Sequence, residues 1–219
     1  MTSIVQAIDT FERIIQSPQI KVDRTDYLLE SFGSIISSQS DCTHLLVDGP
    51  PYSFSRNNLD QEAIQQIKKT CTRFNTFHKN ADAFYQVALR LSQQLAYIYG
   101  FPNVWDKETL LLFLGIMLEV PSSGELLRLK YASNSYLSLN QEQIQTHLST
   151  IMPQILTAFY RAYTLPMFSV KLPILKNVVR YYSARQRLQG IANTLQKTLR
   201  LFASYSEEQL ALDLHILDT

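Results

Sequence analysis

One helical period runs through ADAFYQVALRLSQQLAYIYGF, residues 81–101, and restricts the chain to folds that can cover a long apolar helix face. The apolar residues of this face are Phe84, Val87, Ala88, Leu91, Leu95 and Ile98. Another face carries Asp82, Gln86, Arg90 and Gln94 at intervals of four. Gly100 and the Phe101-Pro102 pair predict the end of the helix, because glycine tolerates a left-handed cap and proline bars continuation.

Similar patterns fill most of the 219 residues and predict an all-α fold. The other helices are expected at residues 4–16, 23–36, 59–77, 106–120, 125–131, 141–163 and 175–202. Only 6 Gly and 8 Pro are present, which favours helices over a turn-rich β architecture. We therefore predict one domain, residues 1–219, built as a multi-helix bundle of about eight helices.

Three local features refine this prediction. The segment 106–120 is apolar nearly all round, so it is expected to be a central helix. Pro153 predicts a kink in its helix, and a shift in the apolar face predicts a break or bend between Arg185 and Gly190. Residues 37–58 lack a helical period and contain Asp48-Gly49-Pro50-Pro51, which predicts one long irregular loop with room for a short strand at THLLV.

Targeting and redox signals are weak. The N-terminal residues lack the basic and continuously apolar regions of a secretory signal, which favours a cytoplasmic protein. The longest apolar run, residues 109–118, is about half of the roughly 20 residues that a membrane span needs. Cys42 and Cys71 have no metal-binding spacing and are expected as reduced thiols, with a single bridge between them left open.

Charge is distributed unevenly along the chain. Residues 143–206 contain no Asp or Glu, whereas residues 207–219 contain four acids and no Lys or Arg. The basic residues of the first segment are Arg161, Lys171, Lys176, Arg180, Arg185, Arg187, Lys197 and Arg200. They are either paired or solvated charges, or a basic face that meets an anionic membrane or an acidic partner. A sequence pI of about 7.7 and the lack of a binding motif disfavour nucleic acid.

Two segments resemble the EcsC family, bacterial proteins whose founding gene lies beside an ABC transporter. In the first, Asp82, Arg90, Ala96, Tyr99 and Gly100 occupy the family's positions in a helix that opens with Asp and ends on a YG pair. In the second, the counterparts are Leu172-Pro173, Asn177, Ala192 and Phe202. The resemblance covers about residues 78–203. It implies an accessory protein that works beside a membrane transport or secretion partner.

The lone acid and base of the opening helix have structural roles available. Asp82 lies in the first turn, where a carboxylate caps free N–H groups and interacts favourably with the helix dipole. Arg90 is about two turns further along, too far for direct pairing with Asp82, so we expect it to bind an acid of a neighbouring helix. The rival interpretation is a pocket around Asp82 and Arg90 that binds, or hydrolyses, a small molecule or lipid.

Sequence motifs for catalysis are missing. The four histidines are scattered, and no GxSxG, GxGxxG or GxxxxGKS motif is present, so we expect no metal, cofactor or conventional enzyme chemistry. The function predicted from these residues is a non-enzymatic adaptor, peripheral to the cytoplasmic membrane or to a membrane-protein partner. A cytosolic immunity or inhibitor-type binding protein fits the composition equally well. The sequence leaves the ligand and the oligomeric state open.

Overall fold

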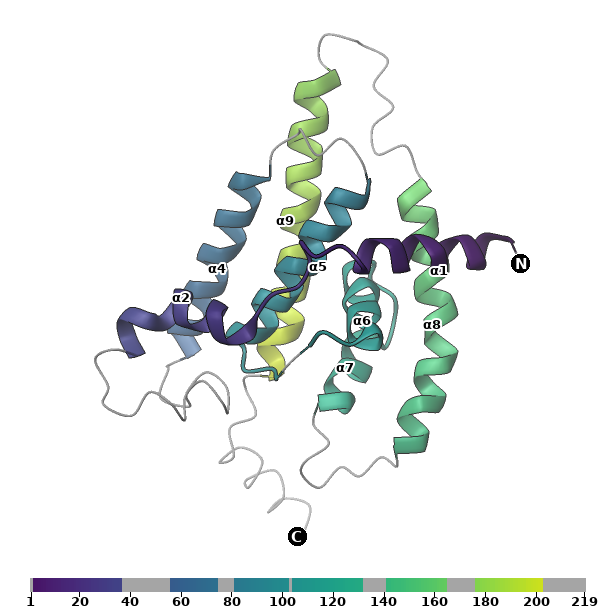
Figure 1. The fold of residues 1–219 in the computed structure, drawn as a ribbon, viewed down its shortest axis with the longest axis horizontal. Helices are drawn as coiled ribbons and strands as arrows, with labels where there is room; N and C mark the ends of the chain where they lie inside the picture. Colours follow the sequence, from purple (N-terminus) through teal and green to yellow (C-terminus); the bar gives the residue numbers. More distant parts are fainter. Residues whose placement is uncertain are drawn as a thin grey trace.

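A computed structural model describes residues 2–36, 56–74, 81–102, 104–131, 141–164 and 176–202. These residues form eight helices and no strand, which confirms the predicted all-α helical bundle (Figure 1). The helices are α1 (Thr2–Ile15), α2 (Arg24–Ile36), α4 (Arg56–Arg73), α5 (Ala81–Ile98), α6 (Lys107–Met117), α7 (Ser123–Tyr131), α8 (Gln141–Thr164) and α9 (Lys176–Phe202).

Helix α5 is the centre of the bundle. It packs against α9, α4, α2, α1 and α6. Helix α1 also crosses α8 (Figure 1). The buried apolar side chains of all eight helices form one contiguous cluster. Because α5 contacts five other helices, its polar side chains are the ones best placed to join separate parts of the bundle.

The end of α5 confirms the predicted helix stop. Gly100 has a φ of 90°, its N–H donates to Tyr97 O at 3.2 Å, and the Phe101 N–H donates to Ala96 O at 3.0 Å. This pair of bonds is the Schellman pattern, in which a left-handed residue satisfies the last free carbonyl groups. The end of α6 repeats it with Glu119, at φ 55°, in the glycine position.

Helix α6 is buried on every side, as its sequence predicts. Each residue from Thr109 to Met117 is buried, and the helix packs against α5, α7, α8 and α9. Its bounds are shorter than the expected 106–120, because Asp106 is its N-cap and the left-handed Glu119 lies just beyond its end.

Other local predictions have mixed outcomes. No break occurs between Arg185 and Gly190, because α9 is continuous and buries a single stripe from Ala184 onward, and the alternative of a bend stays a prediction. Helix α8 contains Pro153 and is continuous, and the kink expected there stays a prediction. Cys71 is a buried free thiol, in agreement with the prediction. Cys42, the THLLV segment and most of the predicted 37–58 loop lie outside the described residues.

A cluster of charges fixes the start of α6. The Asp106 carboxylate accepts from the Thr109 N–H at 2.9 Å and from the Thr109 hydroxyl at 2.7 Å, and it also pairs with Lys130 of α7. Burial acts to raise the pKa of Asp106, but the hydrogen bonds from Lys130 and Thr109 outweigh it and lower the pKa below its ordinary value. The ionised carboxylate therefore stabilises the fold.

We expect Asp106→Asn to remove a pH-dependent part of the stability. A lowered pKa means that the contribution is present above the ordinary Asp pKa of about 4 and is lost as the pH falls through the folded-state value. Asn keeps the cap, so the loss near pH 6 should be about 0.5 kcal/mol, the scale of a half-exposed ion pair. Urea unfolding of both proteins near pH 6 and pH 3 measures it, and a loss of equal size at both pH values contradicts the assignment.

Candidate functional site

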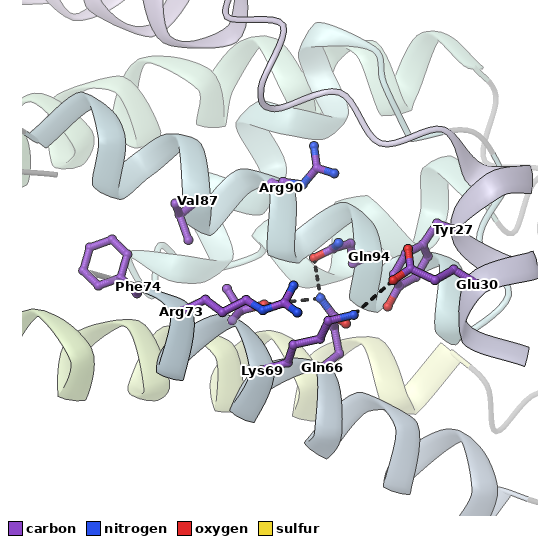
Figure 2. Close-up of a pocket in the computed structure, with 10 residues that line it drawn as sticks. Tyr27, Glu30, Gln66, Lys69, Arg73, Phe74, Val87, Arg90 and Gln94 are labelled. Carbon is purple, nitrogen blue, oxygen red and sulfur yellow. Dashed lines mark hydrogen bonds and ion pairs between the residues drawn. The ribbon is translucent and has the colours of Figure 1, made fainter. Parts of the chain in front are cut away.

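A polar cleft lies between α2, α4 and α5 and has a volume of about 280 Å³ (Figure 2). This size is just below the range that is usual for small-molecule sites. Its lining residues are Tyr27 and Glu30 from α2, Gln66, Lys69, Thr70, Arg73 and Phe74 from α4 and the residue after it, and Val87, Arg90 and Gln94 from α5. Three of these ten side chains are cations and one is an acid.

Helical spacing brings these side chains together. Gln66, Lys69, Thr70 and Arg73 follow at i, i+3, i+4 and i+7, so they share one face of α4. On α5, Val87, Arg90 and Gln94 form an equivalent row that faces them. The packing of α4 on α5 through the apolar faces of both helices therefore leaves the polar row of α4 opposite Arg90 and Gln94 of α5.

Hydrogen bonds from the Gln66 side-chain amide link α4 to α5 at the centre of the cleft. Gln66 Nε2 donates to Gln94 Oε1 at 2.8 Å and to Thr70 Oγ1 at 3.3 Å. Toward α2, Lys69 Nζ pairs with Glu30 Oε1 at 3.1 Å. Figure 2 shows the Gln66–Gln94 hydrogen bond and the Lys69–Glu30 ion pair within the cleft. Phe74 and Val87 lie at one end of the cleft and Tyr27 at the other.

The two guanidinium groups of the cleft have no carboxylate partner among the described residues. Arg90 Nη1 donates to two backbone carbonyls, Gln19 O at 2.8 Å and Lys21 O at 3.1 Å, and its Nη2 and Nε groups have no acceptor among the described residues. Arg73 makes no hydrogen bond or ion pair within the described part of the chain and extends toward Gln66 and Gln94 (Figure 2). Two positive charges at the cleft therefore have no carboxylate partner in the described part of the chain, and Figure 2 shows the Arg90 guanidinium directed toward the α1–α2 connection.

Tyr27 contributes a buried hydroxyl to the same wall. The residue is 7% exposed, and its hydroxyl makes no hydrogen bond of normal geometry, although Ser31 lies close enough to interact with it. Burial raises the pKa of Tyr27, so the hydroxyl keeps its proton, and the hydroxyl oxygen itself is closed off from solvent. Glu62 is close enough to act on the charge of Tyr27; burial raises the pKa of the Glu62 carboxyl, and Lys69 opposes that shift.

Asp82 lies at a different place, between three helices. Its carboxylate binds Arg13 of α1 through two contacts, one of them Arg13 Nη2 to Oδ1 at 3.1 Å, and it accepts from the Tyr163 hydroxyl of α8 at 2.7 Å. The hydrogen bonds to Tyr163 and Asp82 raise the pKa of Arg13. The Asp82 side chain is 16% exposed and is held by partners on two other helices, which the capping role predicted for it does not include.

The structure does not bring Asp82 and Arg90 to a common pocket. Asp82 is bound by Arg13 and Tyr163, whereas Arg90 lies at the α2–α4–α5 cleft. The prediction that an acid of a neighbouring helix binds Arg90 is wrong, because backbone carbonyls of the α1–α2 connection take that place. Neither side chain is arranged beside the other for acid–base chemistry.

The remaining positions of the EcsC-like signature have structural contacts where they are described. Tyr99 is buried and donates to Asp60 Oδ1 at 2.9 Å, and Gly100 forms the helix stop. Asn177 lies in the first turn of α9, and its side chain is outside the described part. Pro173 is outside the described residues altogether. These contacts explain Tyr99 and Gly100 without a ligand.

The predicted basic face divides into bound and exposed cations. Arg187 lies 5.5 Å from the centre of the Phe84 ring and donates to the Tyr85 hydroxyl at 3.5 Å, and Arg200 pairs with Asp60 at 2.6 Å. Arg161 and Lys197 are exposed, and Arg185 is half-buried. Lys171 and the side chains of Lys176 and Arg180 lie outside the described part of the chain, so the basic face as a binding surface stays a prediction.

The cleft is not evident from the sequence, because its cations are scattered in the part of the chain where acids outnumber bases. Lys69 and Arg73 are separated from Arg90 by the end of a helix and by residues 75–80. The sequence pattern that could have indicated the cleft is the polar row of α4 at i, i+3, i+4 and i+7, together with the row on α5 that contains Arg90 and Gln94.

Comparison of the chain with protein-family models, with curated proteins and with solved structures finds no match. The resemblance to the EcsC family therefore stays a prediction. Within the described helices, no segment is long and apolar enough to cross a membrane. The described side chains also contain no group of three or more His, Cys, Asp and Glu residues that is arranged to hold a metal ion.

Proposed function

We propose that this protein is a non-enzymatic binding protein that recognises an anionic group in the cleft between α2, α4 and α5. The observation that carries this proposal is that two arginines, Arg73 and Arg90, line the cleft without a carboxylate partner among the described residues. Arginine binds oxyanions through forked hydrogen bonds as well as through charge, and it stays protonated at any physiological pH.

The proposal keeps the binding role that the sequence predicts and gives it a different site. Charged groups that line a cleft attract a ligand more strongly than the same groups on an open surface, because the surrounding protein excludes part of the solvent. An accessory protein that docks on an acidic partner also relies on contacts between cationic side chains and oxyanions. Docking of the basic 143–206 segment on a membrane is a separate prediction, with vesicle sedimentation as its measurement.

We expect Arg73→Gln to weaken the binding of citrate, used as a multivalent anion probe, by about tenfold, the effect of losing one charged hydrogen-bonding group. Gln has nearly the same helix propensity as Arg, so α4 should be preserved. Isothermal titration calorimetry at low salt measures the affinity. The matched control is Lys68→Gln, the same loss of charge at an exposed position of α4 outside the cleft.

Two results contradict the proposal. One is an affinity that falls equally in Arg73→Gln and Lys68→Gln, because the probe would then respond only to overall charge. The other is wild-type protein that does not bind citrate or any other multivalent anion at low salt, where electrostatic attraction is strongest.

A further inference from the structure

The geometry points to a phosphate monoester, carried on a small organic body, as the group that the α2–α4–α5 cleft binds. This inference rests on the proposed function, since it names the chemistry of the anion that the cleft would take. It is built on the charge balance, the donor arrangement and the shape of the cleft.

The charge balance selects a dianion. Lys69 is paired with Glu30, so its charge is largely compensated within the cleft. Arg73 and Arg90 have no carboxylate partner among the described residues and leave two positive charges. A phosphate monoester carries close to two negative charges at neutral pH, whereas a single carboxylate carries one.

The donors lie on opposite walls and suit a tetrahedral group. Arg73 comes from α4, and Arg90, whose Nη2 and Nε groups have no acceptor in the part of the chain that the structure describes, comes from α5. Gln94 uses its Oε1 to accept from Gln66, so its Nε2 group is a further donor without a partner among the described residues. Several donors from two directions match the three oxygens of a phosphate monoester better than the planar pair of a carboxylate.

The cleft has more room than a bare phosphate ion needs. A volume of about 280 Å³ equals roughly nine water molecules at about 30 Å³ each. Phe74 and Val87 form an apolar end, where a ring or short chain can pack, and Tyr27 lies at the far end (Figure 2). The ligand is therefore a small phosphorylated molecule, or a lipid whose headgroup ends in a phosphate monoester.

The test compares three soluble probes by calorimetry at low salt near pH 7.5. Phenyl phosphate has the monoester and an aromatic body, phenylacetate has the body with a carboxylate, and inorganic phosphate has no body. We expect phenyl phosphate to bind about tenfold more tightly than either of the others, the effect of one additional charged or apolar contact. Arg73→Gln should remove about tenfold of that affinity, and Lys68→Gln should change it by less than about twofold.

Sedimentation with vesicles shows where the monoester is carried. Binding to vesicles that contain phosphatidic acid, absent with phosphatidylcholine alone and lost in Arg73→Gln, supports a lipid source. Tight binding of phenyl phosphate without vesicle binding supports a soluble source.

Two sets of results overturn the inference, and they differ in what they leave standing. If phenylacetate or inorganic phosphate binds as tightly as phenyl phosphate, and Arg73→Gln still weakens binding, the monoester is wrong while the anion site of the proposed function stands. If none of the three probes binds while citrate does, the inference fails and the proposed function stands. If citrate does not bind either, or if Arg73→Gln leaves every affinity unchanged, both the inference and the proposed function fail.

Discussion

Gly115→Ala should destabilise the fold by about 2–3 kcal/mol, although alanine is the better helix former. Gly115 lies on the face of α6 that meets the start of α7, and a Cβ atom there would stand 2.8 Å from both Ser123 Cβ and Ile155 Cδ1 and closer still to Ser123 Oγ. Real side-chain contacts are longer than this, so α6 and α7 would have to move apart. Thermal unfolding should show a fall in Tm of roughly 5–10 °C.

Gly190→Ala is the matched control for this prediction. Gly190 is an exposed residue of α9, and a Cβ added there meets no atom within 4 Å. The same substitution should therefore stabilise the protein by about 0.5–1 kcal/mol through helix propensity alone.

A second control places the clash at a named residue. Ser123→Gly removes both Ser123 atoms that a Cβ at position 115 would meet, at the cost of its hydrogen bond to Val120 O. The double variant should be more stable than the sum of the two single effects by about 1–2 kcal/mol, as expected for residues in contact. Strictly additive losses would show that the two positions do not touch.

Local sequence signals predicted the helices well. The stop at Gly100 and the central position of α6 follow from residues adjacent in sequence, because capping and all-round apolarity are properties of a single segment. The break expected near Gly190 is absent, because the signal behind it was not a property of the segment alone. A change of apolar phase reports which neighbours a helix meets along its length, and it does not require the backbone to bend.

Contacts between distant segments were beyond the sequence. Arg13 and Asp82 are separated by 69 residues, and nothing local marks them as partners. Arg90 binds backbone carbonyls, which every residue possesses, so no acid in the sequence could have identified its partners. The cleft needs α2, α4 and α5 to be placed relative to one another, and only the packing of the apolar faces decides that.

The connection between α1 and α2 is fastened to α5 by polar side chains. Gln93 is fully buried, and its Nε2 donates to Ile20 O at 2.9 Å and to Leu89 O at 3.3 Å. Its Oε1 accepts from the Val22 N–H at 3.4 Å. A single amide thus satisfies a donor and an acceptor of a buried, non-helical backbone, where an unpaired group is costly.

Gln93→Leu should cost about 3 kcal/mol, because it leaves the Ile20 carbonyl and the Val22 N–H without this partner in the protein interior, at about 1–3 kcal/mol each. Leucine has a similar volume, so loss of packing should contribute little. The control is Gln86→Leu, the same change at a half-exposed position of α5, which should stay within about 0.5 kcal/mol of the wild type. Urea unfolding measures both changes.

Hydrogen exchange adds a local measurement that a general loss of stability would not reproduce. In Gln93→Leu the Val22 amide should lose more protection than amides in the middle of α6, because its own acceptor has been removed while α6 keeps its helical hydrogen bonds. If the Val22 amide stays protected and the variant unfolds at the wild-type urea concentration, another acceptor serves this backbone. The connection that also anchors Arg90 would then be held without Gln93, and loss of Gln93 should leave anion binding in the cleft unchanged.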